Sequence, residues 1–194
     1  IVVSDQASPE LKKIAAEFAE YLHRISGAAF TITNGNGSEG IVLGTLAQFP
    51  NRGLKKDLQI RNTFDGKEAY AIRTESKRLL LLGATDLGAS HAAFRFLESI
   101  GCRWFFPAAE WEVVPTIPTL SVLINESDRP ALPSRRIWYG YGFFDREVPR
   151  SIDEYSAWAR HNRMGSSLQI NCGHSWQTII AENKKTFDEH PEYL

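Results

Sequence analysis

The sequence predicts an α/β fold in which two main helices cover one face of a mixed β-sheet. Residues 9–26 and 86–100 each repeat apolar side chains every three or four positions, which is the spacing of a helix with one buried face. Several short segments around them are apolar or alternate between apolar and polar residues, as β-strands do. Because two helices can cover only one face of such a sheet, we expect both on the same side.

The first helix is marked by signals at both of its ends. Ser8 is a favoured N-cap, Pro9 suits the first helical position, and Gly27 suits the left-handed conformation that ends many helices. The apolar residues between these ends fall on one stripe, which we expect to be buried: Leu11, Ile14, Ala15, Phe18, Leu22 and Ile25.

Short strands are predicted before and after this helix, at residues 1–3, 30–33, 40–44, 69–74 and 78–83. The segment Arg78–Gly83 is apolar on both faces, which favours a position in the middle of the sheet. Residues 45–65 are polar and weakly patterned, so we expect a loop that holds at most a short helix.

The second helix is predicted to begin at Thr85 or Asp86 and to end at Gly101. Its apolar side should consist of Leu87, Ala89 or Ser90, Ala93, Phe94, Leu97 and Ile100. Three further extended segments are expected after the helix, at residues 102–106, 111–114 and 120–124.

The polar run Asn125–Pro130 is the predicted domain boundary, with an α/β accessory domain at residues 1–125 and a second domain at residues 126–194. The second part has the order of a βαβ unit, with a strand at 134–141, a helix opened by the capping box Ser151–Glu154, and a strand at 167–172. Such a unit needs more parallel strands to close its sheet. We therefore expect the second part to be the beginning of a larger domain.

The composition argues against several classes of partner. With 22 Lys and Arg against 23 Asp and Glu, the net charge of −1 gives no general attraction to nucleic acid. The longest apolar run, Leu79–Gly83, is far shorter than a membrane-spanning helix, so no membrane insertion is expected. Cys102 and Cys172 are too few and too far apart for a zinc site or a disulfide framework, so we expect buried free thiols.

The turn Gly83–Ser90 lies between a strand and a helix, where a phosphate-binding loop would lie. Its glycine spacing resembles a P-loop, but Ala89 replaces the lysine that should contact phosphate, and the charge of Asp86 would repel an anion. We therefore favour helix capping and close packing of the helix on the sheet. No cofactor and no metal ion are predicted.

Candidate ligand-binding residues are predicted at strand ends, because ligands of parallel α/β sheets bind there. His174 and Trp176 follow the second strand of the βαβ unit, and Trp138 and Tyr139 lie at the exit of its first strand. An imidazole can hydrogen bond to a sugar hydroxyl, and an indole can offer a ring face. The alternative for His174 is a loop histidine beside a packed tryptophan.

Two arginines at the start of that first strand, Arg135 and Arg136, can bind a carboxylate through paired hydrogen bonds, as an acidic sugar would require. We favour instead that they pair with Glu126 or Asp128 near the boundary. The run His161–Arg163 lies late on the intervening helix, where we expect a structural role.

Aromatic side chains are concentrated in Arg103–Pro107 and at Trp111. Flat aromatic faces often bind sugars, so a carbohydrate contact is one interpretation of this cluster. Aromatic residues in small α/β domains more often belong to the core. We favour packing, including packing between the two predicted domains.

The order of these features resembles the domain that precedes the catalytic barrel in family 67 α-glucuronidases and family 20 β-hexosaminidases. The residues that carry the resemblance are the first helix, Gly40–Gly44, Tyr70–Ile72, Leu80–Thr85, Gly88 and Phe96–Phe105. Three later stretches are similar to the barrel start of an uncharacterised bacterial glycoside-hydrolase-like family with the same domain: Asn162–Met164, Gly173–His174 and His190–Tyr193. The resemblance implies an accessory domain like domain 2 of β-hexosaminidases, followed by the first strands of a (β/α)8 barrel.

The resemblance also implies a poly- or oligosaccharide partner and an extracellular or periplasmic location, although the chain carries no signal peptide. No Ser-His-Asp set, His-Glu-x-x-His motif or carboxylate pair at consecutive strand ends is visible in the sequence, so the catalytic residues are unknown and are expected after Leu194. We hypothesise a non-catalytic N-terminal part of a glycoside hydrolase that is inactive by itself. The alternative is a carbohydrate-binding or scaffold module without catalysis.

Overall fold

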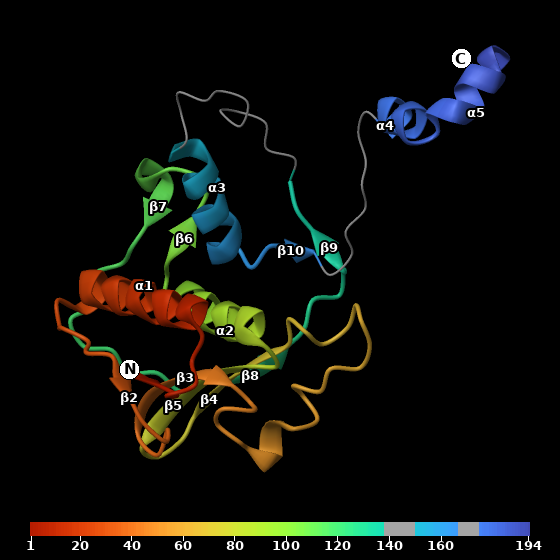
Figure 1. Cartoon of the computed structure of the whole chain (residues 1–194). Helices are drawn as coiled ribbons and strands as arrows, with labels where there is room; N and C mark the ends of the chain where they lie inside the picture. Colours follow the sequence, from red (N-terminus) through yellow and green to blue (C-terminus); the bar gives the residue numbers. More distant parts are fainter. Residues whose placement is uncertain (138–149, 167–174) are drawn as a thin grey trace.

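The computed structural model describes residues 1–137, 150–166 and 175–194, and within them the centre is a six-stranded sheet (Figure 1). The strand order is β2-β1-β3-β5-β4-β8. The bounds are β1 (Val2–Val3), β2 (Thr33–Asn34), β3 (Gly40–Thr45), β4 (Tyr70–Thr74), β5 (Arg78–Gly83) and β8 (Asn125–Asp128). Strands β2, β1, β3 and β5 run parallel, whereas β4 is antiparallel to both β5 and β8. The predicted mixed sheet is confirmed.

Helix α1 (Pro9–Ser26) lies beside the second helix on one face of this sheet, as predicted (Figure 1). The Ser8 hydroxyl caps it by accepting a hydrogen bond from the Leu11 amide at 3.0 Å. At the other end Gly27 takes a φ of 75°, in the left-handed region that favours glycine. Every residue of the predicted stripe is buried, so the local sequence determines this helix and the face it buries.

Helix α2 (Asp86–Ser99) is capped by the Thr85 side chain, which accepts a hydrogen bond from the Gly88 amide. A Cβ added at Gly88 would lie under 3.0 Å from the Ala69 carbonyl oxygen, because the start of the helix presses on the chain that enters β4. This confirms helix capping and close packing at the turn. The prediction that Leu87 belongs to the buried apolar side is wrong, since this side chain is 43% exposed.

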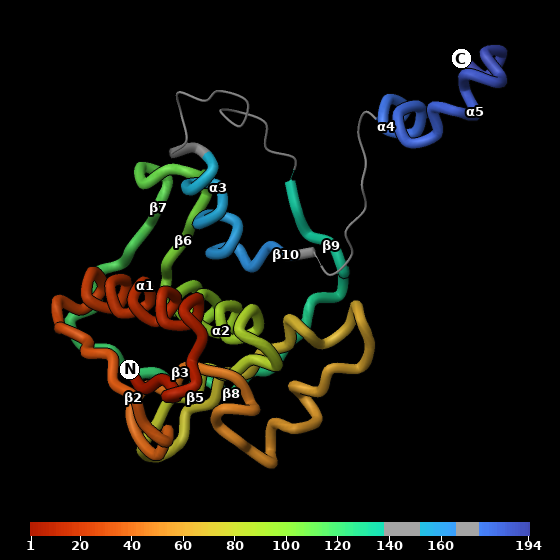
Figure 2. Tube along the Cα trace, in the orientation of Figure 1, coloured from red at the N-terminus to blue at the C-terminus, as the bar shows by residue number. Residues whose placement is uncertain are grey.

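Both faces of the sheet are covered, each by a different part of the chain. Toward the helices the core contains Leu43, Leu79, Leu81, Phe18, Phe94 and Leu97. On the other face the buried residues include Val42, Leu80, Leu82, Phe49, Leu54 and Leu58. The last three come from the predicted loop, which holds the 3₁₀ helix η1 (Arg52–Leu54) and passes under the sheet (Figure 2). Strand β5 is therefore buried on both faces in the middle of the sheet, as predicted.

The edges of the sheet differ from the prediction. The strand expected at 30–33 is the short, exposed β2, and residues 120–124 form no strand. Leu120, Val122 and Ile124 of that second segment pack against the core from an extended chain. Ladder pairing starts only where Asn125 lies opposite Arg73. The polar run expected to be a break thus contains β8. The division into domains of residues 1–125 and 126–194 stays a prediction.

A separate two-stranded ribbon carries the aromatic cluster. Strand β6 (Arg103–Trp104) pairs with β7 (Glu112–Val113), and the 3₁₀ helix η2 (Ala109–Trp111) precedes β7. Packing is confirmed for Trp104, which is 6% exposed and donates its indole N–H to the Tyr21 hydroxyl at 2.8 Å. Core packing is wrong for three other aromatic residues of the cluster, which are exposed: Phe105, Phe106 and Trp111.

Helix α3 (Arg150–His161) lies on the side of α1 and α2 that faces away from the sheet (Figure 1). Its Trp158 indole N–H donates to the Trp104 carbonyl oxygen at 3.0 Å. The Glu17 carboxylate of α1 accepts from Arg160 at 2.7 Å and from His161 at 2.5 Å. The structural role expected for the run His161–Arg163 is confirmed for His161. The helix starts at Arg150, one residue before the predicted cap.

The expected parallel βαβ unit stays a prediction, because its second strand, residues 167–172, lies wholly outside the described residues. Strand β9 (Ser134–Arg135) pairs antiparallel with β10 (Gly165–Ser166). The chain reverses after α3 because Arg163 takes a φ of 54°, a left-handed conformation that costs a non-glycine residue about 1 kcal/mol. Residues 138–141 of the first predicted strand also lie outside the described residues.

The described C-terminal residues form α4 (Ser175–Glu182), α5 (Lys184–Glu189) and the 3₁₀ helix η3 (Pro191–Tyr193), which contact one another. Lys184 and Asp188 form an i, i+4 ion pair of 2.8 Å on α5. Both side chains are well exposed, so this pair adds only a few tenths of a kcal/mol, about 0.3 to 0.5, to the helix. No helix of the described chain is both long and apolar enough to cross a membrane.

Candidate functional site

A cleft of about 590 Å³ lies where the edge of the sheet, α2 and the end of α3 come together. Its wall contains four arginines: Arg95, Arg129, Arg135 and Arg163. They come from α2, from the segment after β8, from β9 and from the turn after α3. Residues far apart in the sequence therefore build one polar surface, which we call the arginine cleft.

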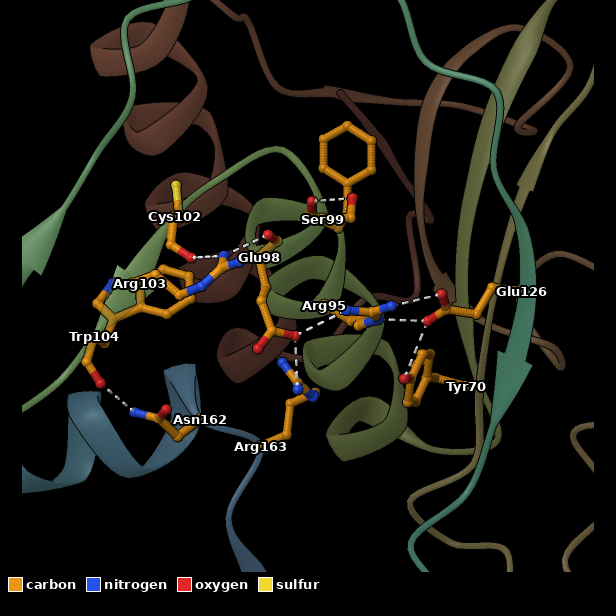
Figure 3. A network of polar contacts seen from close by, with 11 residues as sticks. Tyr70, Arg95, Glu98, Ser99, Cys102, Arg103, Trp104, Glu126, Asn162 and Arg163 are labelled. Carbon is orange, nitrogen blue, oxygen red and sulfur yellow. Dashed lines mark hydrogen bonds and ion pairs between the residues drawn. The ribbon is translucent and has the colours of Figure 1, made fainter.

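The centre of the arginine cleft is a network of ion pairs (Figure 3). Arg95 binds Glu126 through two parallel hydrogen bonds, with Nε to Oε1 at 2.7 Å and Nη2 to Oε2 at 3.0 Å. Its third nitrogen donates to Glu98 at 3.0 Å, and the same Glu98 oxygen lies 2.8 Å from Nη2 of Arg163. The Tyr70 hydroxyl donates to Glu126 at 3.3 Å. This network fixes α2, β4, β8 and the turn after α3 relative to one another.

A buried carboxylate, Glu68, joins the sheet to the segment that follows it. Its side chain is 4% exposed and accepts hydrogen bonds from Arg135 and from Nε2 of His91, the latter at 2.9 Å. Arg135 also donates to the carbonyl oxygens of Leu132 at 2.8 Å and of Arg163 at 3.0 Å. Arg135 therefore holds the chain on either side of α3 against the sheet.

The fourth arginine, Arg129, holds the loop beneath the sheet. Its Nη1 lies 3.1 Å from Asp65, and its Nη2 donates to the Asp57 carbonyl oxygen at 2.6 Å. Its own amide donates to the Asp128 carboxylate at 2.8 Å. Each of the four arginines thus contacts a carboxylate, and the opposite charges in the cleft wall largely cancel.

Glu68 and Glu126 are ionised at neutral pH. Burial by itself would raise the pKa of Glu68, but hydrogen bonds from His91 and Arg135 outweigh it and lower the pKa to about 2. The hydrogen bonds from Arg95 lower the pKa of Glu126. A general acid for glycosidic cleavage needs a raised pKa. Neither of these two groups can therefore protonate a leaving group.

The histidine of the cluster is neutral, because burial lowers the pKa of His91 more than its carboxylate partner raises it. Its Nδ1 atom is buried and has no hydrogen-bond partner in the described part of the chain. Across the ranges that the structure describes, no three His, Cys, Asp or Glu side chains converge as metal ligands would. The arrangement therefore supports binding through hydrogen bonds.

Protonation of Glu68 is expected to destabilise the fold at acid pH. Its folded pKa of about 2 lies below the ordinary value of 4.5, so its contribution is complete above pH 4.5 and is lost as the pH falls toward 2. The loss should reach about 3 kcal/mol, because each pKa unit is worth about 1.4 kcal/mol. Urea unfolding across this range measures it. In the Glu68→Gln variant, the free energy of unfolding should fall less steeply as the pH falls. If the free energies of both proteins fall in parallel, Glu68 is not the group responsible.

Two of the predicted ligand residues, Arg136 and Trp176, are described, and neither lines this cleft. Trp138, Tyr139 and His174 lie outside the described residues. Arg136 is exposed beside the cleft residue Arg135 but is not part of its wall. Trp176 lies at the start of α4, is 53% exposed and has its ring 5.8 Å from that of Phe187. Their roles in ligand binding stay predictions.

Two other predictions can be compared with this geometry. The pairing of Arg135 with Glu126 or Asp128 is wrong, because Glu126 is held by Arg95 and Arg135 binds Glu68. Cys102 is a buried free thiol as predicted, and burial raises its pKa to about 11. Cys172 lies outside the described residues.

The most important polar residues of the cleft were missed by sequence analysis. His91 and Arg95 are four positions apart on α2, so they share a helix face, and this spacing was the one available local signal. Glu68 precedes a strand and belongs to no sequence motif that would mark it as part of a site. Arg163 was recognised only as part of a structural run.

Comparison with known proteins shows a likeness in fold to a solved structure. No protein-family model matches the sequence, and no curated protein matches it significantly. Among solved structures, the chain is similar in fold to part of a glycoside hydrolase, with a TM-score of 0.56 and 13% sequence identity. The glycoside-hydrolase-like fold implied by the family resemblance is confirmed, while the relation to families 67 and 20 stays a prediction.

That structure is described as "A novel family GH115 4-O-Methyl-alpha-glucuronidase, BtGH115A, with specificity for decorated arabinogalactans". The similarity covers 85% of this chain but only 24% of that protein, so this chain spans about a quarter of its length. At this identity the likeness concerns the fold and does not transfer the activity.

Proposed function

We propose that this chain is the N-terminal, non-catalytic part of a longer carbohydrate-active glycoside hydrolase related to α-glucuronidases or β-hexosaminidases. Residues 1–125 would form its accessory domain, and residues 126–194 would begin a (β/α)8 barrel. In this proposal the protein is exported and acts on a poly- or oligosaccharide outside the cytoplasm.

The observation that carries the proposal is the fold similarity to a glycoside hydrolase, which extends over 85% of this chain and 24% of that protein. The electrostatics of the arginine cleft agree with a non-catalytic role. Glycosidic cleavage needs one carboxyl group that is protonated near neutral pH and a second that is ionised. The pKa values of Glu68 and Glu126 are both lowered, so this pair lacks the protonated member.

A second candidate function is a carbohydrate-binding or scaffold module without any catalytic partner domain. Two observations favour it. The arginine cleft presents fixed hydrogen-bonding groups, and the β6–β7 ribbon exposes Phe106 and Trp111 with ring centres 6.0 Å apart. Aromatic faces of this kind can stack on sugar rings. The two candidates differ in whether a longer natural chain hydrolyses a glycan.

Hydrolysis assays distinguish the two candidates. The 194-residue chain alone is expected to show no turnover of aryl glucuronides, aryl hexosaminides or polysaccharides, because the lowered pKa values of Glu68 and Glu126 leave neither as a general acid. The same chain extended by its natural downstream sequence should hydrolyse at least one of these substrates. Turnover by the 194-residue chain would contradict the non-catalytic assignment. Glycan binding without hydrolysis by the extended protein would favour the binding module.

A further inference from the structure

We propose that the arginine cleft binds a neutral, hydroxyl-rich saccharide and that Arg163 is the residue that contacts it. This inference rests on the proposed carbohydrate-related function and adds to it a site, a ligand class and a contact residue. It is carried by the backbone of Arg163, by the hydrogen-bonding capacity of its guanidinium, and by the charge balance of the cleft.

The backbone of Arg163 indicates that its side chain is retained for a reason other than folding. Its φ of 54° is the one positive value of a non-glycine residue in the described chain. Glycine adopts this conformation without steric cost, whereas a residue with a Cβ does not. Strained non-glycine residues are concentrated at ligand sites, where the side chain is needed in that position.

The guanidinium of Arg163 is held in place while most of its donors stay available. Its Nη2 lies 2.8 Å from Glu98, which is itself held by Arg95 (Figure 3). Among the contacts of the described residues, its Nε and Nη1 atoms have no hydrogen-bond partner. The residue lines the cleft, so these donors are available to a ligand there. A donor group that is already fixed loses little entropy when a ligand binds.

The charge balance of the cleft favours a neutral ligand over an anion. Arg95 is neutralised by Glu126, Arg135 by Glu68, and Arg163 by Glu98. Arg129 is likewise paired with Asp65, and Asp128 also lines the cavity, where its charge would repel a carboxylate or a phosphate. Sugar hydroxyls both donate and accept, so they can use guanidinium donors and carboxylate acceptors together.

The size and surface of the cleft agree with this ligand class. Its volume of about 590 Å³ lies within the range of roughly 300 to 1,000 Å³ that is typical of small-molecule sites. Pro130 and Ala131 add apolar surface beside the charged groups, and the C–H face of a sugar ring can pack on such surface. The cleft also lies between parts of the chain that are distant in sequence, where ligand sites are frequent.

The Arg163→Gly variant tests the proposal without removing the fold, because glycine suits the backbone at this position. Calorimetry and NMR titration of the full chain should use neutral xylo-, cello-, manno- and galacto-oligosaccharides. The unmodified chain is expected to bind at least one series. The variant should bind the same series at least tenfold more weakly, with a thermal midpoint that is unchanged or higher.

Arg24→Ala is the matched control, because Arg24 also pairs with a carboxylate, Glu112 at 3.1 Å, but does not line the cleft. Its affinity should equal that of the unmodified chain. Unchanged binding by Arg163→Gly would remove the cleft as the site and leave the proposed function intact. Tighter binding of galacturonate oligosaccharides than of neutral ones would overturn the ligand class. Binding of no saccharide would overturn the inference, and the hydrolysis assay of the extended protein would then decide the proposed function separately.

Discussion

Replacement of Arg135 by alanine is expected to lower the free energy of unfolding by about 3 to 5 kcal/mol, the usual loss when one member of a buried ion pair is removed. Its guanidinium contacts Glu68, whose side chain is 4% exposed and cannot regain its hydration in the folded protein. The same substitution removes hydrogen bonds to the carbonyl oxygens of Leu132 and Arg163. Urea unfolding at neutral pH measures the loss.

The Glu68→Gln, Arg135→Ala double variant is the control for this mechanism. A neutral amide costs less to bury than a carboxylate, so the double variant should be more stable than Arg135→Ala alone. Limited proteolysis should in addition cleave the segment that follows Pro130 faster in the single variant. The reason is that the chain around β9 loses its attachment to the sheet. If the double variant is no more stable than the single one, charge burial is not the cause.

Replacement of Gly88 by alanine should destabilise the protein by about 3 kcal/mol or more, at the upper end for an overpacked core. Alanine is the better helix former by about 1 kcal/mol, so helix propensity alone predicts the opposite sign. The clash dominates, because the new Cβ would lie under 3.0 Å from the Ala69 carbonyl oxygen, a backbone atom next to β4. Thermal and urea unfolding both report the change.

Gly53→Ala is the matched control, since the Cβ built there meets only a side-chain atom, Oδ1 of Asn51, at 3.3 Å. Its stability should stay within about 0.5 kcal/mol of the unmodified chain, as for an ordinary surface substitution. A Gly88→Ala variant as stable as this control would mean that the turn after β5 is not closely packed. The structural interpretation of Gly83–Ser90 would then need revision.

Several elements could be predicted because their determinants are close together in the sequence. The caps of α1, Ser8 and Gly27, act on residues within one helical turn, and its buried stripe follows from helical periodicity. Strand β5 was placed in the middle of the sheet because its residues are apolar on both faces. The edge strand β8 was missed because its residues are polar, and its pairing with β4 depends on a partner about fifty residues earlier.

The candidate site was not predictable in the same way. The ion pair of Arg95 with Glu126 spans 31 positions, and that of Arg135 with Glu68 spans 67. A charged residue in a sequence does not identify its partner, and the partner decides whether its pKa rises or falls. The sequence favoured Glu126 or Asp128 as the partner of Arg135 from proximity along the chain. In the fold, Glu126 is instead hydrogen bonded to Arg95.

The sequence by itself determined the α/β class, the two covering helices and the central strands, because capping, periodicity and two-sided burial are local properties of the chain. Tertiary structure alone decided the arginine cleft, the reversal at Arg163 and the antiparallel contact of β9 with β10. Each of these depends on which distant groups become neighbours when the core closes. Burial then converts such contacts into ion pairs and altered pKa values, which no local pattern encodes.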